Sequence, residues 1–202
     1  GLVISRSTTL RAGVYNLAAR PGPDSAVIVV RGDNITLDMR GVHLIGAPPD
    51  GEPDRAAGVA IFVDSGTNVT IRGAHIRGYK VAILARQTRN LRLLDNDLSY
   101  NWKPRLYSLV EHESLVDWLS YHHNEKDEWL RFGSAVYLRD VFGGEIRGNI
   151  VHQGMNGLLM TNSDSLLIWN NDFSFNSGLG IGMYRSSHNR IMHNRVDYNV
   201  RG

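Results

Sequence analysis

Short apolar segments recur along the chain, and hydrophobic and polar positions alternate within them. Pairs of apolar residues separated by one position keep the same register in successive segments: Ile61/Val63, Ile83/Ala85, Val136/Leu138, Leu158/Met160 and Ile181/Met183. This alternation is typical of short β-strands that bury one face. The pattern therefore predicts a chain built from short strands, with these pairs in the core.

Asparagine marks the later segments at a spacing of about 22 residues. Four segments place Asn three residues after an apolar residue, at Asn96, Asn149, Asn171 and Asn194. The steps between them are 53, 22 and 23 residues, so the first step is one repeat of 22 with an insertion of 31. Asn tolerates the left-handed backbone conformation and can hydrogen-bond to its copy on the next repeat. We therefore expect these residues to form a ladder at the turns.

A repeat of this length leaves no room for a helix in most units, so each repeat closes one coil of a solenoid. Crossovers between parallel strands are right-handed. The sequence predicts an all-β fold, a right-handed single-stranded parallel β-helix of about six to seven coils in a single domain (1–202). A partly helical insertion is expected near 102–132. The last coil has no polar cap, so we expect the natural protein to continue beyond Gly202.

These repeats resemble the parallel β-helix repeat of the pectin-lyase-like superfamily, which includes the NosD-like bacterial proteins. The segments that carry the resemblance are 68–73, 90–96, 145–149, 167–171 and 190–194, and the stretches 10–15, 27–30 and 34–37 resemble the first coils of such proteins. The resemblance extends from Ile4 to Asn199. It implies that one outward strand face forms the floor of a substrate cleft in carbohydrate-active members.

Composition narrows the possible partners. The chain has no cysteine, so disulfides and thiolate ligands are excluded. The net charge is only +2 and no block of basic residues occurs, so we expect no nucleic-acid partner. No apolar stretch is long enough to span a bilayer, so we expect no membrane span. We expect a monomer that takes a polysaccharide or glycan as its partner.

Outward rows of residues can be read across the coils from the strand register. One row holds Asp64, Arg86, Arg139, Thr161 and Tyr184; the next, at the strand end, holds Ser65, Gln87, Asp140, Asn162 and Arg185. Arg86 and Arg139 fall on adjacent coils, where like charges repel, so an anion is expected between them. Asp64 can neutralise Arg86, and Asp140 can turn back to Arg139. A carboxylate or sulfate of a polymer can take either place, while Tyr137 and Phe62 offer rings to sugars. The alternative is a solvated ladder of ion pairs.

The insertion near 102–132 is placed to overhang this face. Trp102, Trp118 and Trp129 are candidates to pin it to the rod, and Trp129 is a candidate substrate contact. His122 and His123 lie beside several carboxylates and are candidate general acids or bases. The alternatives are a charged, solvated helix end and a metal site, although the spacing matches no zinc pattern.

Two classes of function remain open. The first is a secreted or periplasmic carbohydrate-active enzyme, lyase- or epimerase-like, that acts on an acidic polysaccharide. Its candidate catalytic residues are Arg139, Asp140, His122, His123 and Arg185. Its candidate substrate contacts are Asp64, Arg86, Tyr137, Tyr184 and Trp129. The resemblance implies that Arg or Ca²⁺ neutralises the substrate carboxylate, but the sequence shows no clear acidic cluster for Ca²⁺, so the cofactor stays open. Hydrolysis is less favoured, because the two aspartates lie about 10 Å apart. The second class is a non-catalytic glycan-binding or scaffold protein.

Overall fold

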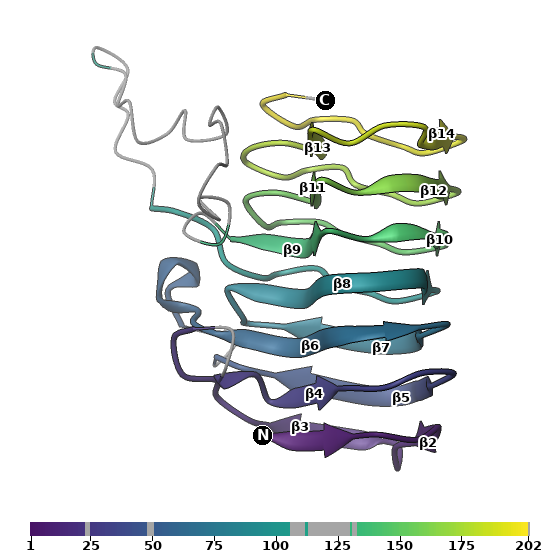
Figure 1. The fold of residues 1–202 in the computed structure, drawn as a ribbon. Coiled ribbons are helices and arrows are strands. Elements are labelled where there is room, and N and C mark those ends of the chain that lie inside the picture. The colour runs from purple at the N-terminus through teal and green to yellow at the C-terminus, as the bar shows by residue number, and fades with distance from the viewer. Residues whose placement is uncertain (23–24, 48–50, 106–111, 113–129, 131–132, 202) are drawn as a thin grey trace.

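The computed structural model describes residues 1–22, 25–47, 51–105, 112, 130 and 133–201. Its strands pair in parallel within one 14-stranded sheet that coils along a rod (Figure 1). The elements are β1 (Leu2–Ile4), β2 (Thr8–Thr9), β3 (Gly13–Asn16), β4 (Ile28–Val30), β5 (Thr36–Ile45), η2 (Pro53–Arg55), β6 (Val59–Thr67), β7 (Thr70–Arg77), β8 (Val81–Leu94), β9 (Ser134–Arg139), β10 (Phe142–Arg147), β11 (Leu158–Thr161), β12 (Asp164–Trp169), β13 (Ile181–Tyr184) and β14 (Arg190–Met192). The predicted right-handed parallel β-helix is confirmed.

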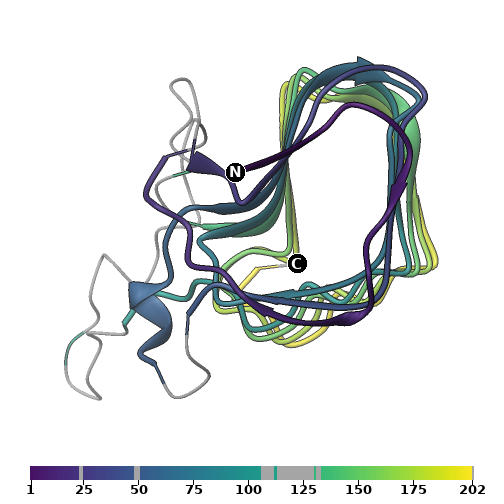
Figure 2. The ribbon, with the colours of Figure 1, turned by 90° about the horizontal axis from the view of Figure 1, so that it is seen from below.

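Each coil has two strand-forming sides and a third side, which pairs as strands in the first coils (β3, β5 and β7) and through isolated bridges in the later ones. The long strand β8 belongs to both strand sides, since its first half pairs with β6 and β9 and its second half with β7 and β10. The third side runs through His75, Asp97, Ile150, Asp172 and Arg195, which form single parallel bridges. Viewed along the rod, the coils superpose closely and the loop that carries η2 projects from one corner (Figure 2).

The core is made of rows of inward apolar side chains, one from each coil. The register joins Val30, Val63, Ala85, Leu138 and Met160 in one such row, and all five are buried. The predicted apolar pairs stand in register from β6 to β13, as the sequence pattern indicated. Burial of these rows stabilises the fold by roughly 25 cal/mol for each Å² of apolar surface removed from water.

One outward row is buried rather than open, which corrects the sequence prediction. Phe62, Leu84, Tyr137 and Leu159 stand in the predicted register, but they are between 0 and 6% exposed. They form a second apolar cluster outside the coil, and Leu130 packs against it. Leu130 comes from the predicted insertion, so part of that segment lies on this face. The signal was present in the sequence, because residues 59–63 and 81–85 are apolar at successive positions, which is typical of a strand covered on both faces.

The asparagine ladder is present and lies inside the coil. Asn96, Asn149 and Asn171 are 1 to 3% exposed, and each side-chain Nδ2 donates to Oδ1 of the next asparagine at 2.9 Å. The same Oδ1 atoms also accept backbone N–H groups; Asn149 Oδ1, for example, accepts the backbone N–H of Asn96 at 3.1 Å. Each amide therefore satisfies backbone groups at a turn and links two coils, which confirms the structural role predicted for the ladder.

The left-handed residue at this turn is not the ladder asparagine but the residue before it. Asp95, Gly148, Asn170 and His193 have φ between 54° and 67°, whereas the asparagines that follow do not have positive φ. In a separate, exposed ladder the asparagines are themselves left-handed and also hydrogen-bond to one another between coils. Asn34, Asn68 and Asn90 are all left-handed, and they are joined by Nδ2 to Oδ1 hydrogen bonds of 2.7 Å.

Most of the predicted insertion falls outside the described residues, as do the positions on which its helical character was predicted. Its two ends are described: Trp102 donates its indole N–H to the carbonyl of Asp54 at 2.9 Å, and Leu130 packs against the outer apolar cluster. No helix among the described residues is long and apolar enough to cross a membrane.

Candidate functional site

One corner of the coil, within β6 and β8 and just after β9, β11 and β13, places polar side chains on the outside of the rod. At this corner Ser65, Gln87, Asp140, Asn162 and Arg185 have φ between 46° and 66°. A left-handed residue turns the chain sharply, so each coil bends at the same place. The residue just before the turn and the residue at the turn therefore form two adjacent outward columns, as the sequence rows predicted.

A groove of about 590 Å³ lies along these columns. Its lining residues, which we call the arginine groove, are Val29, Arg31, Phe62, Asp64, Arg86, Gln87, Arg139 and Asp140. Four predicted site residues thus come together: Asp64, Arg86, Arg139 and Asp140. The described lining carries three guanidinium groups and two carboxylates on neighbouring coils.

Asp64 pairs with an arginine that the sequence analysis missed. Arg31 forms an ion pair with Asp64, and its Nε donates to Asp64 Oδ2 at 3.0 Å. The expectation that Asp64 neutralises Arg86 is therefore wrong in its partner, because the carboxylate turns toward the preceding coil. Arg31 was overlooked because the first coils are longer, with 33 positions between it and Asp64 where later coils have 22 or 23. The register of β4 with β6 is the signal that would have found it.

Arg86 and Arg139 are direct neighbours in the parallel register of β8 and β9. The guanidinium carbon of Arg86 lies 5.9 Å from the centre of the Phe62 ring. Arg139 Nε lies 3.5 Å from Asp140 Oδ2, as expected from the sequence. The other carboxylate oxygen of Asp140 accepts the Nδ2–H of Asn162 at 3.2 Å. Asp140 is therefore held from two sides, which fixes the edge of the groove.

The remaining predicted site residues are distributed elsewhere. Tyr137 is fully buried, so its ring is covered in this structure and does not face the groove. Tyr184 lies two coils beyond Arg139 in the same column, and the Arg185 guanidinium carbon lies 5.0 Å from its ring centre. Two coils amount to about 10 Å, so this pair is separate from the groove. His122, His123 and Trp129 lie outside the described residues.

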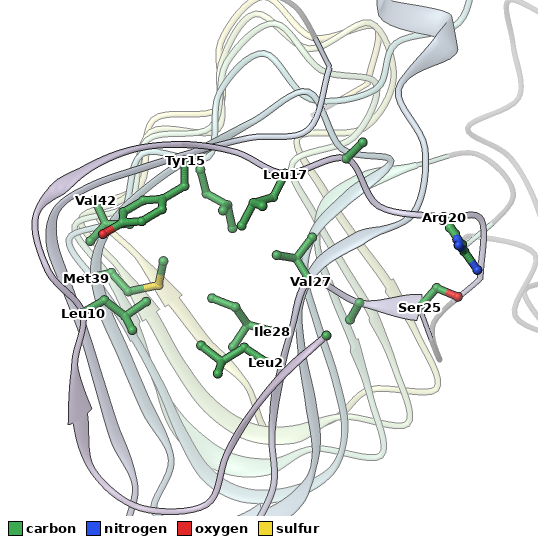
Figure 3. Close-up of a pocket in the computed structure, with 14 residues that line it drawn as sticks. Leu2, Leu10, Tyr15, Leu17, Arg20, Ser25, Val27, Ile28, Met39 and Val42 are labelled. Atoms are coloured by element: carbon green, nitrogen blue, oxygen red, sulfur yellow. The ribbon is translucent and has the colours of Figure 1, made fainter.

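Another hollow, of about 600 Å³, opens at the end of the rod that carries β1 and β3 (Figure 3). It is lined by apolar side chains, among them Leu2, Leu10, Ile28, Met39 and Val42. Ile28, Met39 and Val42 belong to the buried core, so the hollow is the end of the inward rows rather than a surface site.

Potential metal ligands gather most closely on the third side of the coil. The imidazole rings of His43 and His75 are stacked 4.5 Å apart at an interplanar angle of 11°, and His75 Nδ1 lies 3.7 Å from Asp97 Oδ2. The lone pairs of an imidazole lie in its ring plane, so two parallel rings do not aim them at one point. In the described ranges, no group of three or more His, Asp or Glu residues is arranged to hold a metal ion, and the chain has no cysteine.

A separate cluster of charged residues lies away from the groove, on β5 and β7. Asp38 is 3% exposed and accepts hydrogen bonds from Arg40 and Arg72. The hydrogen bonds from Arg40 hold the pKa of Asp38 well below its ordinary value, against the effect of its burial, and Arg72 adds to the shift. Because Arg72 stands beside Asp38 on the next coil, its hydrogen bonds to Asp38 fasten adjacent coils.

Comparison with known proteins places the chain among β-helix proteins. No curated protein matches it. A crystal structure of the enzymatically active domain of bacteriophage CBA120 tailspike protein 2 is similar, with 12% identity and a TM-score of 0.40; the match covers 98% of this chain and 38% of the tailspike chain. The model of the family described as periplasmic copper-binding protein (NosD) matches residues 24–202. Because this match includes most of the chain and agrees with the coil geometry, the protein belongs to the NosD family of parallel β-helix proteins.

Proposed function

We propose that this protein binds an acidic polysaccharide along the arginine groove, and that it does so in the periplasm, the location named in the family description. The observation that carries the proposal is the placement of Arg31, Arg86 and Arg139 along one groove. Guanidinium groups bind carboxylates and sulfates through two parallel hydrogen bonds, which gives both strength and orientation. A surface that repeats such groups from coil to coil suits a ligand that repeats its charges.

The groove is arranged for binding more clearly than for catalysis. Its two carboxylates are both engaged, Asp64 with Arg31 and Asp140 with Arg139 and Asn162. Each carboxylate thus faces a neighbouring side chain of the protein rather than standing alone toward a ligand in the groove. We therefore propose non-catalytic binding as the primary role. A lyase- or epimerase-like activity on the bound polymer is the finer form of the same proposal.

Copper, which the family description names, does not fit the donor sets that the structure describes. Soft thiolates are absent from the chain, and the stacked rings of His43 and His75 do not direct their lone pairs to a common centre. We therefore derive no step that involves copper.

The test compares anionic and neutral polymers on the whole protein. Isothermal titration calorimetry with polygalacturonate, alginate and a neutral glucan is expected to show binding of the first two only. Arg139→Gln is expected to weaken binding of the anionic polymers by roughly tenfold, the loss of one charge-assisted contact of about 1.4 kcal/mol. Arg89→Gln is the matched control, since Arg89 is an exposed arginine of the same strand as Arg86 and lies outside the groove.

Following unsaturated product in the same samples separates the two forms of the proposal. Binding without product supports the non-catalytic role, and product formation that Arg139→Gln abolishes supports the lyase-like step. Equal affinity for anionic and neutral polymers, or an equal effect of Arg89→Gln and Arg139→Gln, would overturn the charge-recognition role of the groove.

A further inference from the structure

Tyr100 is held in a backbone conformation that bulky residues avoid. Its φ is 59°, and its backbone is fixed by hydrogen bonds to the coils on either side, from Gly78 N at 3.0 Å and to His152 O at 2.8 Å. The preceding coil has Gly78 at this corner, with φ of 75°, and glycine pays no steric cost there. A tyrosine at this corner is less favourable than glycine, although the same left-handed conformation recurs in later coils and so belongs to the coil itself.

Other aromatic residues at the same corner offset their strain by stacking, but Tyr100 does not. Phe175 and Tyr198 are also left-handed, and their rings stack 5.0 Å apart at 8°. In the part of the chain that the structure describes, no aromatic ring stacks on Tyr100, which is 65% exposed. Gln153 occupies the corner between Tyr100 and Phe175. The ring of Tyr100 therefore faces solvent, and no ring contact with the described residues offsets the unfavourable backbone conformation.

Two hollows meet at Tyr100. One, of about 360 Å³, is lined by Tyr100, Arg77 and Asp97 together with the stacked histidines of the third side. The other, of about 410 Å³, is lined by Tyr100, Arg77, Lys103 and Gln153. Both volumes fall within the range of small-molecule sites, about 300–1,000 Å³. Tyr100 and Arg77 line both hollows and so stand between them.

The charged groups of these hollows include cations that are not engaged elsewhere. Among the described residues, neither Arg77 nor Lys103 forms a side-chain ion pair, whereas Glu52, at the rim, pairs with Arg105 at 3.8 Å. An aromatic face beside a guanidinium and an ammonium suits a ligand with one apolar face and one anionic group.

We propose that Tyr100, Arg77 and Lys103 form a second binding site, for a single acidic sugar unit that carries a carboxylate or sulfate. The sugar ring stacks on Tyr100, and its anionic group lies between Arg77 and Lys103. The site lies beyond the C-terminal end of β8, on the third side of the coil, and shares no residue with the arginine groove. The proposal therefore does not rest on the groove.

The experiment uses the property that glycine relieves the backbone strain while it removes the ring. Tyr100→Gly is expected to keep or raise the melting temperature and to lose at least tenfold in affinity for digalacturonate, measured by calorimetry on the whole protein. Tyr100→Asn is a second variant, since asparagine also tolerates the left-handed conformation. Tyr198→Gly is the matched control at the same corner, and it is expected to bind digalacturonate as the wild type does. Arg77→Gln is expected to weaken digalacturonate binding and to leave the melting temperature unchanged.

The outcomes separate this site from the groove. Two binding events that become one in Tyr100→Gly and also one in Arg139→Gln support both sites. One event that Tyr100→Gly abolishes and Arg139→Gln leaves intact supports the Tyr100 site alone. If a folded Tyr100→Gly or Tyr100→Asn variant binds digalacturonate with the affinity of the wild type, or if Tyr198→Gly weakens binding equally, the proposal is overturned.

Discussion

Asp64 is paired with Arg31 on the preceding coil and not with Arg86, its register neighbour on the following coil. The Nε–H of Arg31 donates to Asp64 Oδ2 at 3.0 Å, and the Asp64 side chain is 31% exposed. An internal carboxylate therefore occupies one of the guanidinium groups that line the groove. A ligand anion at this end of the groove has to compete with Asp64 for Arg31.

Asp64→Asn is expected to strengthen the binding of anionic polymers, because it removes this competition and one negative charge from the groove. The gain is expected to be about threefold to tenfold at low salt and smaller at high salt, since charges near the surface are screened. Calorimetry with polygalacturonate at two salt concentrations measures it. Asp197→Asn is the control, because Asp197 also forms an exposed ion pair, with Arg195 at 2.9 Å, and lines neither the groove nor the hollows at Tyr100; an equal gain there would assign the effect to net charge alone.

The sequence predicted the coil, its register and the charged columns, because the repeat spacing determines which residues stand above one another. It placed Arg86 beside Arg139 for this reason. It could not predict the partner of Asp64, since the longer first coils hide the position of Arg31. The covered outer row was visible in the sequence as apolar residues at successive positions of the strands, but the segment that covers Tyr137 was not. That covering depends on residues that pack from outside the repeat, such as Leu130.

Tyr137→Phe tests the burial of the outer apolar row. Because the Tyr137 ring is covered, removing its hydroxyl is expected to leave the affinity for acidic polymers within twofold of the wild type. The hydroxyl lies 3.4 Å from Thr161 Oγ1, so a stability loss of about 1 kcal/mol is expected from thermal or urea unfolding. A selective loss of polymer affinity at unchanged stability would show that the ring reaches the ligand after all.

Asn149→Ala tests the inner asparagine ladder. The amide of Asn149 donates to Asn171 Oδ1 and to Leu93 O, both at 2.9 Å, and accepts from the backbone N–H of Asn96. Alanine leaves these buried groups without partners, and each unsatisfied group costs about 1–3 kcal/mol. We expect a loss of about 3–5 kcal/mol in the free energy of unfolding.

Asn68→Gly is the comparison for the ladder, because Asn68 is exposed, water can replace its side-chain bonds, and glycine accepts its left-handed backbone without steric cost. We expect this variant to lose about 1 kcal/mol or less in urea unfolding. Similar losses in the two variants would mean that burial does not set the strength of the ladder.

Asp38→Asn tests the coil-fastening cluster through its pH dependence. The pKa of Asp38 is lowered by hydrogen bonds from Arg40, so the carboxylate contributes stability above its ordinary pKa of 3.8. As the pH falls below that value, the unfolded chain takes up a proton before the folded chain does, and the contribution declines until the folded group also protonates. The variant is expected to be about 1–3 kcal/mol less stable than the wild type from pH 5 to 8. Urea unfolding at successive pH values should show this difference narrowing below about pH 4. A constant difference down to pH 2 would mean that the side chain stabilises the coils through its shape and not through its charge.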